Sequence, residues 1–137
     1  MKARVNWVHD FRMEGQTESA NIVHMDSVPK EEKSAGASPS ELILQALAGC
    51  TMMDIVIMVR KAKMKIEKFW IDVDADIADD YPKVFKHIHL TYNLISTDLD
   101  NATLENAIKL SEDKYCRVHA MLRGSVKITS SYNIERP

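Results

Sequence analysis

Apolar residues dominate one long stretch of the chain, where they occupy nearly every position from 42 to 59. That density is typical of a helix buried on all sides rather than along one stripe. Ser38 suits an N-cap, Pro39 suits the first helical turn, and Glu41 follows at the capping-box position. The pattern predicts a central helix over residues 38–64.

Elsewhere apolar and polar residues alternate, which is the period of a half-buried strand. Before the central helix this alternation predicts strands over 2–9 and 20–26, a turn at Gly15, and a polar loop over 28–37. After the helix the same logic predicts an antiparallel hairpin, a helix capped by Asp100 or Asn101, a short helix beginning at Cys116, and a last strand. We therefore expect one α+β domain over residues 1–137, with these parts: N-terminal strands 1–27, central helix 38–64, hairpin 66–95, second helical region 100–124 and C-terminal strand 125–135.

Composition narrows the function classes. With 45% apolar residues, 28% charged residues and a net charge of −2, the chain can build an ordinary core and gives no electrostatic reason to bind nucleic acid or an anionic membrane. Gln45 and Asp54 would be costly inside lipid, so the apolar run predicts a core helix rather than a membrane span. No N-terminal signal is evident, and we expect a cytoplasmic protein.

The candidate chemistry lies in the two cysteines, Cys50 in the central helix and Cys116 near the start of the late helix. In a reducing compartment such a pair indicates catalysis, redox sensing or metal binding rather than a structural disulfide. The residues alone leave their order open. Arg117 and His119 favour a thiolate at Cys116, whereas burial and the nearby Asp54 disfavour one at Cys50.

Two stretches carry a resemblance to a known family: SPSELILQALAGC, which opens the central helix, and LSEDKYCRVHAML around the second cysteine. Together with the order of elements, they resemble the OsmC/Ohr family of thiol-dependent hydroperoxide reductases, and most closely its shorter OsmC-like branch. The resemblance spans nearly the whole chain. It implies an OsmC-like fold, with antiparallel sheets packed around the buried cysteine-bearing helix, and an intertwined homodimer with two sites where the subunits meet.

The resemblance also implies an antioxidant activity. Cys50 is then the peroxidatic residue, which attacks an organic hydroperoxide, and Cys116 is the resolving residue, which forms a disulfide with it. A dithiol, in the family typically a dihydrolipoyl protein, restores both thiols, and no cofactor is needed. We expect such an enzyme to act in the response to oxidative stress.

Two further site residues follow from the family pattern, in which an arginine of the N-terminal sheet pairs with a glutamate at the start of the central helix. Arg12 is the first candidate for the arginine and Arg4 the second. Ser40 occupies the position of the family's glutamate, and Glu41 stands one place later. Glu41 either substitutes for that glutamate after a small shift or serves only in the capping box.

Two alternatives belong to other classes. A redox-sensing or ligand-binding dimer would form the disulfide without turnover. A metal-binding protein would use His87 and His89, on one face of a strand, with Cys116 and His119, which have helical spacing.

Overall fold

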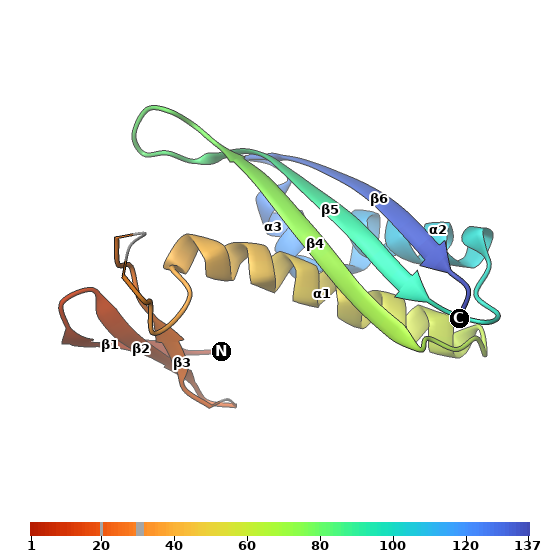
Figure 1. Ribbon diagram of the computed structural model, residues 1–137, viewed down its shortest axis with the longest axis horizontal. Helices are drawn as coiled ribbons and strands as arrows, with labels where there is room; N and C mark the ends of the chain where they lie inside the picture. The colour runs from red at the N-terminus through yellow and green to blue at the C-terminus, as the bar shows by residue number, and fades with distance from the viewer. Residues whose placement is uncertain (20, 30–31) are drawn as a thin grey trace. The chain divides into compact units, whose positions relative to one another are not determined.

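The computed structural model describes residues 1–19, 21–29 and 32–137. Within it the chain forms two compact units, Met1–Leu44 and Gln45–Pro137. Each unit contains its own three-stranded sheet (Figure 1). That the whole chain is one domain stays a prediction.

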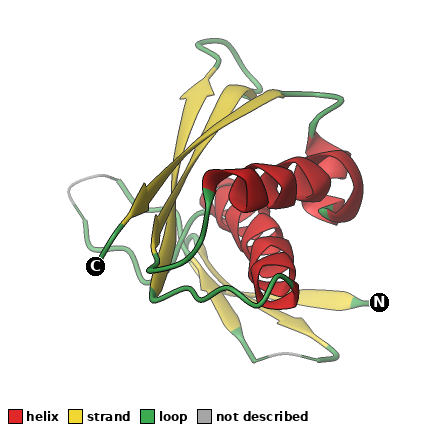
Figure 2. Ribbon diagram, turned by 90° about the vertical axis from the view of Figure 1, so that its right-hand side faces the viewer, coloured by secondary structure: helices red, strands yellow, loops and turns green. Residues whose placement is uncertain are grey.

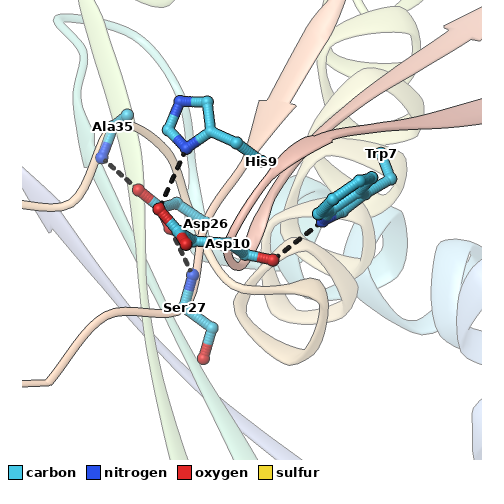
Figure 3. Close-up of polar contacts among 6 residues, drawn as sticks. All are labelled: Trp7, His9, Asp10, Asp26, Ser27 and Ala35. Carbon is cyan, nitrogen blue, oxygen red and sulfur yellow. Dashed lines mark hydrogen bonds and ion pairs between the residues drawn. The ribbon is translucent and has the colours of Figure 1, made fainter.

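The first unit is a meander of three antiparallel strands, β1 Ala3–His9, β2 Arg12–Thr17 and β3 Val23–Met25. The turn between β1 and β2 lies at Asp10, which has a φ of 46° and whose carbonyl accepts a hydrogen bond from Trp7 Nε1 at 2.8 Å (Figure 3). The turn predicted at Gly15 is wrong, because Gly15 lies inside β2. A Cβ there would come within 3.1 Å of Met25 Cε, so the glycine makes room for a side chain and not for a turn.

A buried carboxylate organises the segment after β3. Asp26, which is 8% exposed, accepts hydrogen bonds from the backbone N–H groups of Ser27 at 2.8 Å and Ala35 at 3.0 Å (Figure 3). One side chain therefore binds both Ser27, just before the predicted loop 28–37, and Ala35 within it. Lys30 and Glu31 of that loop, and Ala20 of the predicted strand 20–26, lie outside the described residues.

The central helix α1 runs from Pro39 to Lys61. The predicted capping box is present: Ser38 N donates to Glu41 Oε2 at 2.7 Å, and Glu41 N donates to Ser38 Oγ at 3.3 Å. Among the described residues α1 is the one helix long and apolar enough to cross a membrane, a test that core helices of soluble proteins also pass.

Burial of α1 differs from the sequence prediction. Its buried residues recur every fourth position and form a single stripe: Leu47, Thr51, Ile55 and Val59. Met53 and Ile57 are 65% and 50% exposed. In the single chain the helix is thus buried along one stripe and not on all sides, because the sheet of residues 45–137 covers only one side of it.

The second unit is built on a sheet with β5 Phe85–Ile95 at its centre, flanked by β4 Lys68–Ile77 and β6 Lys127–Glu135. The helices lie on one side of this sheet (Figure 2). Alternate β5 side chains face them and form the middle of the core: Ile88, Leu90, Tyr92 and Leu94. As predicted, the opposite face of β4 exposes its three aspartates, Asp72, Asp74 and Asp76.

The α+β class is confirmed, with one difference in the sheet. The strands β4 and β5 form the predicted antiparallel hairpin, but β6 pairs with β5 in parallel. The reason is the connection: the chain leaves β5, passes through the late helices and returns in the same direction, as a crossover of this length permits.

The late helical region contains α2 Asn101–Leu110, a π-helical turn η1 Ser111–Tyr115, and α3 Arg117–Leu122. Asp100 caps α2, since its Oδ1 accepts from Thr103 N at 2.7 Å. The predicted helix to about residue 114 and the second helix after Cys116 are both present.

Candidate redox site

Cys116 lies at the junction between η1 and α3, in the core of the second unit. It is 2% exposed and caps α3, with its sulfur accepting from His119 N at 3.3 Å. Its own N–H donates to Ser111 O at 2.8 Å. One main-chain hydrogen bond therefore holds the sulfur, and a second holds the backbone of the same residue.

Cys50 lies in α1 within the same unit, half-buried, and both cysteines are free thiols. Burial first, and the Cys50 thiol second, raise the pKa of Cys116 to about 12, against the opposing effect of the His119 and Val118 backbone N–H groups. The capping position, which on its own favours a thiolate, is outweighed, so Cys116 remains a protonated thiol at neutral pH.

Buried and half-buried polar side chains lie on the elements that carry or pack against the cysteines. The Tyr92 hydroxyl, fully buried, donates to Glu112 Oε1 at 3.3 Å, and burial raises the pKa of Tyr92 well above its usual value. Ser111 Oγ donates to Asp54 Oδ2 at 2.8 Å. Sequence reasoning missed the tyrosine, the glutamate and the serine as neighbours of the cysteines. The one available signal was a tyrosine at a core-facing position of β5, whose hydroxyl needs a partner when buried.

His119 is 8% exposed, and burial lowers the pKa of its imidazole. Its Nδ1 atom is buried and has no hydrogen-bond partner among the described residues. The imidazole is thus held neutral inside the core, and it does not supply the positive charge that the sequence suggested for Cys116.

Arg12 and Glu41 belong to the other unit. Arg12 begins β2, and its Nε atom is buried without a partner in the described part of the chain. Glu41 is engaged by the Ser38 backbone in the capping box. Arg4, the second candidate, is an exposed residue of β1. Whether any of them serves the cysteines stays a prediction.

The four side chains of the metal alternative do not come together. His87 Nε2 and His89 Nδ1 both contact Thr129 Oγ1, at 2.6 and 2.7 Å, on the sheet face opposite the helices. Cys116 and His119 lie in the helical layer. Within residues 1–19, 21–29 and 32–137, no group of three or more potential ligands could hold a metal ion.

Comparison with known proteins points to one family. The family model described as OsmC-like protein matches residues 30–131. Protein YhfA of Escherichia coli K12 is 31% identical over 134 residues, with 98% of each chain covered.

Solved structures agree. The OsmC-like protein from Mycoplasma pneumoniae superposes with a TM-score of 0.82 at 19% identity, over 97% of this chain and 95% of that one. The organic hydroperoxide resistance protein OhrB of Bacillus subtilis gives 0.66 at 16% identity, over 97% and 98%. These two structures show the shared fold.

Proposed function

The chain belongs to the OsmC family, and from that premise we propose that it is a thiol-dependent peroxidase that reduces organic hydroperoxides. The observation that supports the proposal is that the chain's two cysteines lie in the same unit, where the Cys50 thiol is one of the groups that raise the pKa of Cys116. Two neighbouring thiols are what a cycle of peroxide reduction and disulfide formation requires.

The proposed cycle has three steps. The Cys50 thiolate attacks the peroxide, so that the O–O bond breaks, the sulfur becomes a sulfenic acid, and the alkoxide leaves and takes up a proton to become the alcohol. The Cys116 thiol then forms a sulfur–sulfur bond with Cys50, and the sulfenic hydroxyl leaves with the thiol proton as water. A dithiol reduces this disulfide by exchange and is itself oxidised to a disulfide.

Burial and charge support this order of the cysteines. Cys50 is half-buried, whereas Cys116 is 2% exposed and has its pKa raised to about 12. A peroxide must reach the attacking sulfur, and a thiolate is the better nucleophile. Cys50 therefore suits the peroxidatic role, and Cys116 suits the resolving role.

The rest of the site is proposed on family grounds. We propose that Arg12 stabilises the negative charge of the Cys50 thiolate, either with Glu41 or with Glu41 restricted to the capping box. We also propose an intertwined homodimer, whose second copy covers the exposed face of α1 at Met53 and Ile57. A dihydrolipoyl protein is the proposed reductant, and the cytoplasm the proposed location.

Steady-state consumption of cumene hydroperoxide with a dithiol tests the activity. We expect turnover in the wild type, no turnover in Cys50→Ser, and one burst of oxidation per subunit in Cys116→Ser. Serine keeps the size of each side chain and removes only the thiol. The opposite pattern in the two variants would show that the roles are reversed.

A redox sensor is the second candidate. The observation that favours it concerns Glu41, which stands one place after the family's glutamate position. Its carboxylate already accepts a hydrogen bond from Ser38 N in the capping box, so it is engaged outside the proposed catalysis. A sensor would form the Cys50–Cys116 disulfide with peroxide but would show no dithiol-dependent turnover, so the same assay separates the two candidates.

A further inference from the structure

One partly buried hydrogen bond joins the two elements that carry the cysteines. Asp54 follows Cys50 by one helical turn, so both side chains lie on the same face of α1. From the other element, Ser111 donates its hydroxyl to Asp54 Oδ2 at 2.8 Å. Ser111 is fully buried and Asp54 is half-buried, so the bond is shielded from water on the Ser111 side.

The same serine also holds Cys116 directly. Its carbonyl accepts the Cys116 N–H at 2.8 Å, which is the hydrogen bond that closes the π-helical turn η1. Isolated π-helical turns of this kind occur frequently at functional sites. Ser111 therefore contacts α1 through its side chain and the cysteine-bearing turn through its main chain.

The outer side of the turn offers a natural contrast. Lys109 and Asp113 form an ion pair at 2.8 Å, with side chains that are 77% and 61% exposed. Exposed pairs contribute little because water and salt compete with them. The inner bond is different, since removal of one partner leaves a desolvated polar group without a hydrogen bond. Two side-chain bonds of equal length thus flank one turn, and only the inner one reaches α1.

We propose that Asp54 and Ser111 are positioning residues for the resolving step, holding the Cys116 sulfur in register with Cys50. This inference rests on the proposed function. In that step the Cys116 sulfur bonds to the Cys50 sulfur, the S–O bond of the sulfenic acid breaks, and water leaves. A disulfide tolerates Cα separations of only roughly 4.4 to 6.8 Å, so a small shift of η1 disfavours it. Among the described residues, no hydrogen bond joins either side chain to the Cys50 or Cys116 sulfur.

The test is the redox equilibrium of the full-length protein in buffers of reduced and oxidised dithiothreitol, with the disulfide quantified by intact mass. We expect Ser111→Ala to lower the equilibrium constant for the Cys50–Cys116 disulfide by about tenfold or more, equivalent to about 1.4 kcal/mol. Asp54→Ala removes the same bond from the other side and should do the same, which keeps the test available if one variant does not fold.

Two matched variants sharpen the result. Asp54→Asn keeps an oxygen that accepts from Ser111, so its equilibrium constant should stay near that of the wild type. Asp113→Ala removes the exposed pair of the same turn and should leave the constant unchanged. A purely structural role would lower stability in the folded variants without shifting the disulfide equilibrium.

The disulfide equilibrium tests the positioning role, and peroxide consumption tests the peroxidase. If the wild type forms the disulfide and both alanine variants keep its equilibrium constant, the positioning role is overturned and the peroxidase is not. The positioning role is likewise overturned if Asp54→Asn is as weak as Asp54→Ala, because charge and not the hydrogen bond would then matter. If the constant shifts as expected but the wild type consumes no peroxide, the peroxidase proposal fails and the positioning role stands.

Discussion

The two units of the chain differ in what they bury. Every buried apolar side chain among the described residues lies within Gln45–Pro137, including Leu90 and Leu94 at the centre of β5. In Met1–Leu44 the strand β1 is exposed along its whole length, and Trp7 and Phe11 are 73% and 65% exposed. Both units contain strands and helical residues, but only the second unit has a core of buried apolar side chains among the described residues.

This difference shows that strand pattern and burial are separate properties. The alternation in β1 is as regular as that in β5, yet β1 is exposed along its whole length whereas β5 buries Ile88, Leu90, Tyr92 and Leu94. A sheet without a covered apolar face gains little from the hydrophobic effect. The first unit therefore needs a surface to cover it, in agreement with the proposed homodimer.

The largest expected effect is the slow reaction of Cys116 with alkylating reagents. With its pKa raised to about 12, Cys116 holds too little thiolate at pH 8.5 to react at the rate of an ordinary cysteine, whose pKa is about 8.5; we expect a deficit of roughly 10³-fold. Iodoacetamide labelling followed by peptide mass mapping reports each cysteine separately, with protein in urea as the control. Equal labelling of Cys116 in folded and unfolded protein would contradict the enclosed core.

The raised pKa of Cys116 also makes the stability of the fold depend on pH. Because the pKa is higher in the folded state, the protonated thiol is favoured by folding. Its contribution to the free energy of unfolding is complete below the pKa of the unfolded thiol and is lost as the pH rises towards about 12.

The next largest effect concerns the core itself. Leu90→Ala should lower the free energy of unfolding by about 2–5 kcal/mol, because Leu90 is fully buried and truncation leaves a cavity. Ile77→Ala is the control in the same sheet, at a residue that is 55% exposed, and should cost less than about 1 kcal/mol. Urea denaturation measures both. Similar losses in the two variants would mean that residues 45–137 have no distinct core.

The third effect concerns self-association through the exposed strand β1. If a second copy covers β1, Trp7→Ala should weaken self-association by at least about tenfold, since tryptophan is a frequent interface hot spot. Tyr81→Ala, at a residue that is 88% exposed outside the strands, is the aromatic control. Sedimentation equilibrium measures both dissociation constants. A wild type that stays monomeric at micromolar concentration would contradict the proposed cover.

Much of the fold was predictable because local rules decide it. The capping box at Ser38, the Asp100 cap and the alternation along β5 each depend on residues close together in the sequence. The turn at Gly15 was wrong because a glycine also serves close packing, and its neighbour Met25 lies on another strand. The parallel pairing of β6 depends on the path of the whole connection, which no local pattern reveals.

The candidate site was predictable only in part. The family resemblance singled out the two cysteines, and their roles stay a prediction. The thiol pKa of Cys116 depends on burial, which outweighs the cap that the sequence suggested. The bond from Ser111 to Asp54 joins residues far apart in the chain, and neither belongs to a recognisable motif. Such contacts exist only once the helices are packed.

A smaller effect tests whether the start of α1 is locally stable. Ser38→Ala should cost about 1 kcal/mol, the usual value for loss of an N-cap side chain. Ser38→Thr keeps the hydroxyl and is the control. The free energy of unfolding from urea titration gives the cost, and amide exchange at Glu41 reports the lost bond to Ser38 Oγ directly. A cost of several kcal/mol would show that the cap supports far more than one helix turn.

The smallest expected effect is the acid dependence contributed by the cap of α2. The backbone N–H of Thr103 holds the pKa of Asp100 below its usual value, because it donates to the ionised carboxylate. With a lower pKa in the folded state, the stabilisation is present above the pKa of the unfolded carboxyl and is lost as the pH falls through the folded value.

Asp100→Asn keeps the capping oxygen and removes the titration. Its stability at neutral pH should stay close to that of the wild type, while its loss of stability between about pH 5 and pH 3 should be shallower. Thermal melts of both proteins across that range measure the difference, and parallel pH profiles would show that Asp100 is no more favoured as an anion in the folded chain than in the unfolded one.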